Sequence, residues 1–225
     1  MKLGNNTKLF ITCDSGAGAG KTTASKYLKK KYGLSLLTSG LLYRFVALRL
    51  LVAKKTVNDT SFLKKITKNI NPNSLNSIKL YSPKVTLYVS EVAKVKEVRK
   101  LLKNYQKRFA KKRCVIIEGR DIGSIFPEAD VKFFFKCSLK VAAKRRFKEF
   151  AKINKNITLK DVKKAIRLRN LVDTKRKNSP LRVPKGAVII STSKLNKKQM
   201  FKKISSIVDR KLLLKYGRKL KASKK

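Results

Sequence analysis

A group of residue types that bind phosphate lies at residues 14–23, which read DSGAGAGKTT. This segment holds three of the chain's ten glycines at alternate positions and ends in a lysine and two threonines. It follows a short apolar run at Lys8–Cys13 and precedes a helical pattern at Lys21–Tyr32. Glycines between a strand and a helix let backbone N–H groups point inward, and the helix N-terminus adds unpaired donors. We therefore expect a phosphate-binding loop, with a flexible surface loop as the simpler alternative.

The side chains of this loop have separate expected roles. Lys21 would reach the terminal phosphates, and the hydroxyl of Thr22 would be a ligand of Mg²⁺. The residues expected to bind a phosphate donor are Ser15, Gly16, Ala17, Gly18, Ala19, Gly20, Lys21, Thr22 and Thr23. Ser15 stands where the strict pattern has its first glycine, six residues before the lysine. We therefore expect the loop to turn differently at its start.

A second stretch, Thr38–Arg44, reads TSGLLYR and opens a predicted helix. Tyr43 and Arg44 follow Ser39 by four and five residues, so they flank the helix face below it. Arg44 could hold a phosphate there. A capped helix with an exposed arginine gives the same pattern, and this stretch alone favours that simpler interpretation.

A third stretch, Glu118–Gly123, reads EGRDIG and follows a predicted buried strand. Two acids and an arginine at this position are unusual in a chain with only 12 acidic residues. Ligands of open α/β sheets bind at the carboxyl ends of the strands. Position therefore favours a functional role over a surface ion pair, and Glu118 could hold Mg²⁺ through water.

A fourth stretch, Arg169–Arg176, reads RNLVDTKR. Arg169, Asp173 and Arg176 are spaced at i, i+4 and i+7, which places all three on one face of a helix. A solvated stripe of ion pairs is the alternative interpretation. The following residues 178–180, Asn-Ser-Pro, indicate a helix end that can hinge.

Short apolar strands alternate with helical patterns over most of the chain. The predicted strands are 8–13, 34–37, 114–117, 131–135 and 187–190, and the predicted helices are 21–32, 39–51, 138–153, 159–173 and 197–214. Such alternation predicts an α/β fold, with a central parallel five-stranded sheet covered on both faces.

One polar, proline-containing region, residues 58–109, interrupts the alternation and is expected to be an insert, helical from Val85 onward. We expect a core formed by residues 1–57 and 110–214, with a lid at about 154–180, and a basic tail at 215–225.

The chain of 225 residues has 59 basic and 12 acidic side chains and a net charge of +47. A polyanion such as RNA would explain this charge. The lysines are spread along the whole chain, however, which favours a general bias in composition, so we expect no obligate nucleic-acid partner. We also expect a cytoplasmic location and no membrane partner, because no apolar run approaches the roughly 20 residues of a membrane span. A monomer is expected.

The chain contains no histidine and only three cysteines, none of them in a CxxC pair. These facts exclude Ser-His-Asp and Cys-His catalysis and argue against a zinc site.

Together these stretches resemble the bacterial cytidylate kinases, the (d)CMP kinases of the nucleoside monophosphate kinase group. The resemblance runs from Lys8 to about Leu195. It rests on the ordered set TSGLLYR, SEVAKVKEVR, EGRDIGSIFPEADVKFFF and R-x3-D-x2-R followed by SPL. It implies a three-layer P-loop NTPase fold with a monophosphate-binding insert and a lid. It also implies that ATP with Mg²⁺ binds the glycine loop and that CMP or dCMP binds as the phosphate acceptor.

The resemblance carries over to individual residues. The positions that match the family's monophosphate contacts are Ser39, Tyr43, Arg44, Ser90, Arg99, Arg120, Asp121, Arg169, Asp173 and Arg176. The cations expected to hold the transferring phosphate are Lys21, Arg44, Arg120, Arg169 and Arg176, with Arg145 and Arg146 joining from the lid helix. The chain departs from the family at Ser15, at Thr38 and Lys136, where the family often has acids, and in a shorter insert before Lys79.

Two other functions stay open at this point. One is a small-molecule P-loop kinase that acts on UMP, another monophosphate or shikimate. The other is an RNA-stimulated P-loop ATPase, which the net charge suggests. The scattered lysines, and the arginines placed at strand ends, argue against the RNA-stimulated enzyme.

Overall fold

The structure is a computed structural model that describes residues 3, 6–151 and 157–217. Residues 154–156 of the predicted lid and residues 218–225 of the predicted tail lie outside this range. By its internal contacts the chain divides into two compact units. The first consists of Met1–Leu37 and Arg113–Lys225, and the second of Thr38–Lys112.

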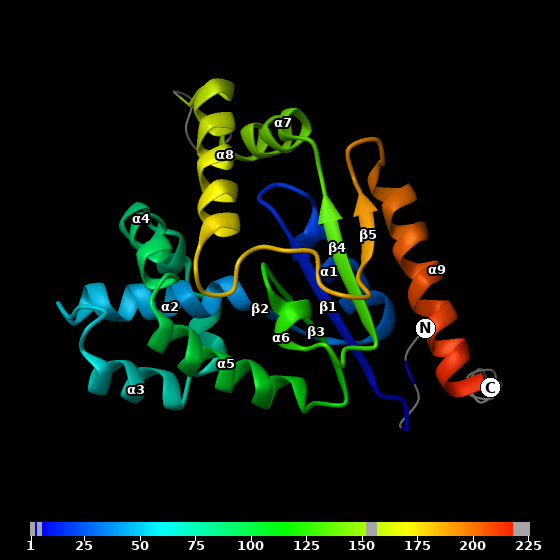
Figure 1. The fold of residues 1–225 in the computed structure, drawn as a ribbon, viewed down its shortest axis with the longest axis horizontal. Helices are drawn as coiled ribbons and strands as arrows, with labels where there is room; N and C mark the ends of the chain where they lie inside the picture. The colour runs from blue at the N-terminus through cyan, green and yellow to red at the C-terminus, as the bar shows by residue number, and fades with distance from the viewer. Residues whose placement is uncertain (1–2, 4–5, 152–156, 218–225) are drawn as a thin grey trace. The chain divides into compact units, whose positions relative to one another are not determined.

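The first unit contains the five-stranded parallel sheet that the sequence predicts (Figure 1). Its strands are β1 (Leu9–Ser15), β2 (Ser35–Thr38), β3 (Cys114–Gly119), β4 (Val131–Lys136) and β5 (Val188–Ser191). Their order is β2-β3-β1-β4-β5, and β1 pairs in parallel with both β3 and β4. The loops that follow these strands therefore emerge at one edge of the sheet, where the ligands of parallel sheets bind.

The described helices of the first unit are α1 (Lys21–Tyr32), α6 (Ile122–Ile125), α7 (Leu139–Phe150), α8 (Leu159–Lys175) and α9 (Lys197–Tyr216). Four of them begin and end within a few residues of the predicted positions, and the short α6 was not predicted. Thr158 and Asp161 form a capping box at the start of α8, and Asn196 and Gln199 form one at the start of α9. These local signals fix where the two helices begin.

The main core of this unit lies where α1 and α9 pack against β1, β4 and β5. Leu28 of α1 and Val208 of α9 are completely buried there, together with Ile11 and Phe133 of the sheet. A smaller apolar cluster holds α7 to α8. Figure 1 shows these two helices beyond the carboxyl end of β4, where they can reach the loops of the sheet edge.

Apart from Thr38, the last residue of β2, the regular secondary structure of the second unit is helical among the described residues. It contains α2 (Ser39–Val52), α3 (Thr60–Lys68), α4 (Pro83–Val92) and α5 (Lys96–Ala110), with two 3₁₀ turns, η1 (Pro72–Asn76) and η2 (Ile78–Tyr81). The predicted insert, 58–109, falls inside this unit. The unit begins earlier, at Thr38, because α2 packs against α3, α4 and both turns.

No helix in the described part of the chain combines the length and apolar character needed to cross a bilayer.

Asp14 ties the end of β1 to the segment that follows β3. Its carboxylate is completely buried and accepts the N–H groups of Ile122 at 2.9 Å and Gly123 at 2.6 Å. Gly123 permits this approach, because a Cβ there would lie 2.7 Å from Cγ of Pro184 and 3.2 Å from Oδ2 of Asp14. Burial raises the pKa of Asp14 to about 6, although the two N–H donors favour the charged form.

The raised pKa of Asp14 predicts a specific dependence of stability on pH. Because the folded-state pKa of about 6 exceeds the ordinary value of about 3.9, the folded chain binds the extra proton between these two pH values. The contribution of Asp14 to the free energy of unfolding therefore falls as pH rises through this window, by up to about 1.4 kcal/mol per unit. The amide that replaces the carboxyl in the variant Asp14→Asn cannot titrate, so this part of the slope should disappear.

Urea unfolding of both proteins at intervals from about pH 4 to 7 measures this effect. The difference in unfolding free energy between wild type and Asp14→Asn should change across the window. A constant difference would show that Asp14 does not titrate with a raised pKa.

Candidate functional site

The predicted phosphate-binding loop joins β1 directly to α1. Gly18 and Gly20 have φ values of 72° and 86°, in the left-handed region that favours glycine. Gly20 caps α1 without a side-chain hydrogen bond, and the first turn has no acidic residue. The first N–H groups of the helix therefore face an external acceptor without competition from a capping side chain, which is the arrangement that binds anions.

Two elements support this loop from outside. A Cβ at Gly18 would lie 3.0 Å from Cβ of Ala142 in α7 and 3.1 Å from its carbonyl oxygen, so the loop and α7 are in close contact. The carbonyl of Ala19 accepts a hydrogen bond from Thr192 Oγ1 at 3.0 Å. Arg145 donates to the same threonine, to Oγ1 at 3.0 Å and to the carbonyl at 2.7 Å. Arg145, expected to contact the transferring phosphate, thus contacts the segment that supports the loop.

The start of the loop, where Ser15 replaces the usual glycine, has three contacts. Ser15 Oγ donates to the carbonyl of Gly16 at 2.8 Å, and the carbonyl of Ser15 accepts from Arg120 Nη1 at 3.0 Å. The N–H of Ala17 donates to Oδ1 of Asn170 in α8 at 2.9 Å. Asn170 was not among the predicted site residues, and its place beside Arg169 was the only signal in the sequence.

Lys21 and Thr22 both contact Glu118, the fifth residue of β3. Lys21 Nζ lies 3.4 Å from Glu118 Oε2, and Thr22 Oγ1 donates to Oε1 at 3.2 Å. Glu118 is completely buried. A hydroxyl and a carboxylate are oxygen donors of the kind that Mg²⁺ prefers, so these residues fit the expected ion. No group of three or more metal-binding side chains occurs in the described ranges, so the ion would take further oxygens from water or phosphate.

Two predicted arginines and two predicted acids form one ion-pair network. Arg120 Nη1 lies 3.3 Å from Oδ2 of Asp173. Arg176 Nη1 lies 3.3 Å from Oδ1 of Asp173, and Arg176 Nη2 lies 3.6 Å from Oδ1 of Asp121. Burial lowers the pKa of Arg120 to about 10, while Asp173 opposes the shift, so the guanidinium stays charged at neutral pH. Arg169 is exposed on the same helix, α8. The network therefore holds cations in fixed positions next to the loop.

The segment after α8, where a hinge was predicted, is held close to the helix end. Arg176 Nε donates to the carbonyl of Ser179, and the N–H of Leu181 donates to the carbonyl of Asp173 at 2.8 Å. Ser179 has a φ of 53°, which is uncommon for a residue other than glycine. The chain turns sharply here and keeps Arg176 beside Asp173.

The remaining predicted residues lie in the second unit. Arg44 donates to the carbonyl of Leu80 at 2.8 Å and to Thr86 Oγ1 at 3.0 Å, so it joins α2 to η2 and α4. The guanidinium of Arg99 is buried and lies 5.4 Å from the ring centroid of Tyr43.

The two predicted serines of this unit have different surroundings. Ser39 is buried at the first residue of α2, whereas Ser90 is exposed on α4. The second unit thus brings Tyr43 and Arg99 together and leaves Ser90 facing solvent.

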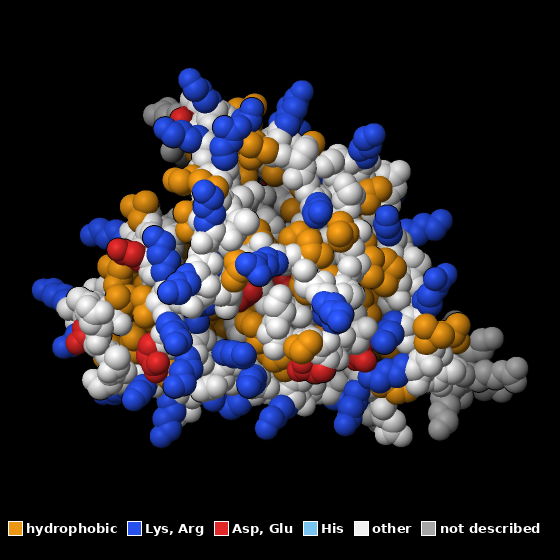
Figure 2. Space-filling view, viewed as in Figure 1, with side chains coloured by type: hydrophobic (Ala, Val, Ile, Leu, Met, Phe, Trp, Pro, Cys, Tyr) orange, Lys and Arg blue, Asp and Glu red, His pale blue; other side chains and the backbone are white. Residues whose placement is uncertain are grey.

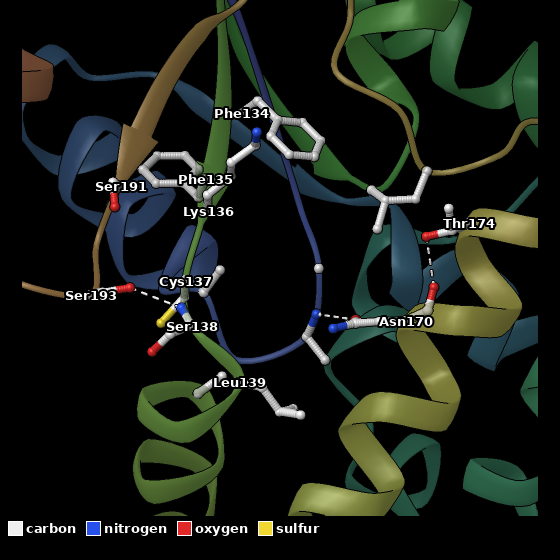
Figure 3. A pocket seen from close by; sticks show the side chains of 15 residues that line it. Phe134, Phe135, Lys136, Cys137, Ser138, Leu139, Asn170, Thr174, Ser191 and Ser193 are labelled. Carbon is white, nitrogen blue, oxygen red and sulfur yellow. Dashed lines mark hydrogen bonds between the residues drawn. The ribbon is translucent and has the colours of Figure 1, made fainter.

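A pocket of about 380 Å³ opens beside the phosphate loop (Figure 3). The loop forms one side of it, the end of β4 and the start of α7 form another, and α8 and the segment after β5 complete it. Lys136, at the position where an acid is common in the resembled family, lines this pocket together with Cys137 and Asn170. The departure at Lys136 therefore adds a positive charge beside the loop.

Comparison with known proteins gives the same family that the sequence motifs resemble. The sequence model of a family described as cytidylate kinase matches residues 11–210. A protein named cytidylate kinase from Fusobacterium nucleatum is 32% identical over 213 residues, which is 90% of this chain and 98% of that protein. One from Clostridium botulinum with the same name is 36% identical over 213 residues, with the same coverage of 90% and 98%.

Among solved structures, an uncharacterized protein from Eubacterium ventriosum has a TM-score of 0.52 at 13% identity, over 90% of this chain and 99% of that chain. At this identity the likeness concerns the fold alone. The match to the family over residues 11–210, and the relatives that it covers almost completely, show that this chain belongs to the cytidylate kinase family.

Proposed function

We propose that this chain transfers the γ-phosphate of ATP to CMP or dCMP and releases CDP or dCDP. Membership of the cytidylate kinase family supports this reaction class. The observation that carries the proposal is the junction at Arg120, which donates to the carbonyl of Ser15 in the phosphate loop and pairs with Asp173 in α8. The contact supports the proposal because Arg120, for which we propose a catalytic role, touches the loop that would hold the donor.

The geometry suits phosphoryl transfer because this reaction depends on positioned charge more than on covalent catalysis. Backbone N–H groups of the loop and Lys21 would bind the phosphates of ATP. Arg120 and Arg176 are already oriented by Asp173 and Asp121, so they need little rearrangement to stabilise negative charge on the transferring group. We propose the same role for Arg44 and Arg169.

We propose that Thr22 binds Mg²⁺ directly and that Glu118 holds it through water. The ion would neutralise charge on the donor phosphates. Glu118 also contacts Lys21 and Thr22 in the structure, so it orients both side chains.

For the acceptor we propose the roles that the family resemblance implies. Asp121 would accept from the N4 amine of cytosine, which uracil lacks, because uracil has an oxygen there and two acceptors would repel. Ser90 with Arg99 or Arg120 would donate to the ring acceptors, and Asp173 would bind the ribose hydroxyls. Ser39 and Tyr43 complete the proposed set. A carboxylate has several acceptor positions, so Asp121 and Asp173 can keep their arginine partners while binding a ligand.

We also propose that residues 58–109 form the monophosphate-binding insert and that residues from about 154 to 180, which include α8, act as the lid. Lid closure would keep water away from the donor phosphate. The cytoplasmic location and the monomeric state stay predictions.

Lys and Arg side chains cover the face drawn in Figure 2 without gathering in one place. This distribution does not mark a particular groove for RNA, so it gives no support to the RNA-stimulated ATPase.

A panel of acceptors tests the proposed function. With ATP and Mg²⁺, the wild-type chain should form ADP rapidly with CMP or dCMP and slowly with UMP, AMP, GMP or shikimate. In Asp121→Asn the preference for CMP over UMP should fall by about tenfold or more, because the amide no longer presents two acceptor oxygens. A coupled assay of ADP formation measures both results.

Faster turnover with a different acceptor would contradict the proposed cytidylate kinase activity and favour another small-molecule kinase. Turnover that requires RNA and not CMP would favour the ATPase. An unchanged CMP preference in Asp121→Asn would remove that aspartate from base recognition and leave the reaction itself unaffected.

Replacing Lys21 by Met should lower kcat by about a hundredfold or more, because the charge next to the donor phosphates is lost while the side-chain length is kept. Lys26→Met is a matched control on the same helix, since Lys26 is exposed. The control should keep nearly full activity. Equal activity of the two variants would show that Lys21 has no special role.

Replacing Glu118 by Gln should raise the Mg²⁺ concentration for half-maximal activity by about tenfold or more, because a neutral amide orients metal-bound water less well. Glu128→Gln, at an exposed position, is the control and should match the wild type. Titration of Mg²⁺ at constant ATP gives the half-maximal concentrations. An unchanged requirement in Glu118→Gln would place the ion away from Glu118.

A further inference from the structure

The hydrogen bond between Ala17 and Asn170 joins the phosphate loop to α8. The N–H of Ala17 lies 2.9 Å from the carboxamide oxygen of Asn170, at the edge of the pocket in Figure 3. A backbone amide held in this way is not available to a phosphate oxygen unless Asn170 leaves. Asn170 has no role in the function proposed above, although it is the helix neighbour of Arg169.

The loop is shaped to receive this side chain. A Cβ at Gly16 would lie 3.1 Å from Oδ1 and 3.3 Å from Nδ2 of Asn170, which is closer than ordinary contact. The φ of Gly16 is not positive, so the turn itself does not require glycine at this position. The lack of a side chain at Gly16 therefore leaves the space that the carboxamide of Asn170 occupies.

A second contact acts in parallel with the first. Arg120 donates to the carbonyl of Ser15 and pairs with Asp173, which lies one helical turn beyond Asn170 in α8. The start of the loop is thus connected to α8 directly through Asn170 and indirectly through Arg120. Two connections to successive turns fix the position of the helix along the loop, which one connection would leave free to pivot.

We propose that Asn170 is a positioning residue, whose carboxamide oxygen holds α8 against the start of the phosphate loop. This inference rests on the proposed function. By holding α8, Asn170 sets the positions of Arg169 and Arg176 relative to the transferring phosphate. The donor phosphates are then bound by the loop amides from Gly18 onward, and the amide of Ala17 serves α8.

Three variants distinguish the effect of the acceptor oxygen of Asn170 from the effect of its side-chain shape. Asn170→Leu keeps a similar volume and has no acceptor. Asn170→Asp keeps an oxygen that can accept from Ala17. Leu168→Ala alters an exposed side chain of the same helix and serves as the control for general effects on α8.

The first measurement is hydrogen exchange of the Ala17 amide, followed by NMR in the nucleotide-free full-length chain. Exchange should be about tenfold or more faster in Asn170→Leu than in the wild type, because the amide loses its acceptor. It should stay close to the wild-type rate in Asn170→Asp and Leu168→Ala. Equal exchange rates in the wild type and Asn170→Leu would overturn the proposal.

The second measurement is the kinetics with CMP and ATP. In Asn170→Leu, kcat should fall by about tenfold or more while KM for ATP changes by less than about threefold, because misplaced cations affect the transition state more than the ground state. Asn170→Asp should restore most of kcat, and Leu168→Ala should match the wild type. A lower KM for ATP with unchanged kcat would show that Asn170 competes with the phosphates and would overturn the proposal.

A failure of the proposed function can be told apart from a failure of this inference. If the wild type does not phosphorylate CMP, the reaction assignment fails, and the exchange of the Ala17 amide still decides whether Asn170 holds the loop. If the wild type is active and Asn170→Leu is equally active, the reaction assignment stands and the positioning role fails.

Discussion

The site of the first unit depends on the interactions of one largely buried guanidinium, that of Arg120. A buried charge is tolerated only when hydrogen bonds and opposite charges surround it. Arg120 meets this requirement with the carbonyl of Ser15 and the carboxylate of Asp173, so β3, the phosphate loop and α8 must come together around it. Asp173 also pairs with Arg176, which extends the constraint to the end of α8. The fold of this region and the placement of its cations therefore have one physical cause.

Scarce acidic residues organise an abundant positive charge in this chain. Asp14, Glu118, Asp121 and Asp173 are four of only 12 acids, and each is buried or nearly so beside the loop or the strand ends. Three of them pair with Lys21, Arg120 or Arg176. Among the residues that the structure describes, most Lys and Arg side chains are exposed at the surface, where ion pairs contribute little. The carboxylates therefore distinguish the cations with a defined position from those that only add to net charge.

The phosphate loop shows how much of a binding motif lies outside the motif. Gly18 and Gly20 supply the backbone conformations, but Ala142, Thr192 and Asn170 hold the loop in place from three other elements. Support of this kind matters for phosphoryl transfer, because a preorganised site needs little reorganisation when charge develops. Ser15, which replaces the first glycine, is also held by contacts of this kind. Its carbonyl accepts from Arg120, and its hydroxyl donates to the carbonyl of Gly16.

The sequence by itself determined the strands, the longer helices of the core and the alignment of Arg169, Asp173 and Arg176 on α8, because hydrophobic periodicity and helical spacing are local properties. It did not predict the short helices α3 and α6. It also located the glycine loop, since that motif needs a fixed order of residues. The tertiary structure decided the order of the strands, the burial of Asp14, the contact of Asn170 with Ala17 and the binding of Arg145 to Thr192. Ala17 and Asn170 are 153 positions apart, and no local pattern encodes a contact over that distance. Such contacts exist only after the parallel sheet brings its strand ends and their following loops to one edge.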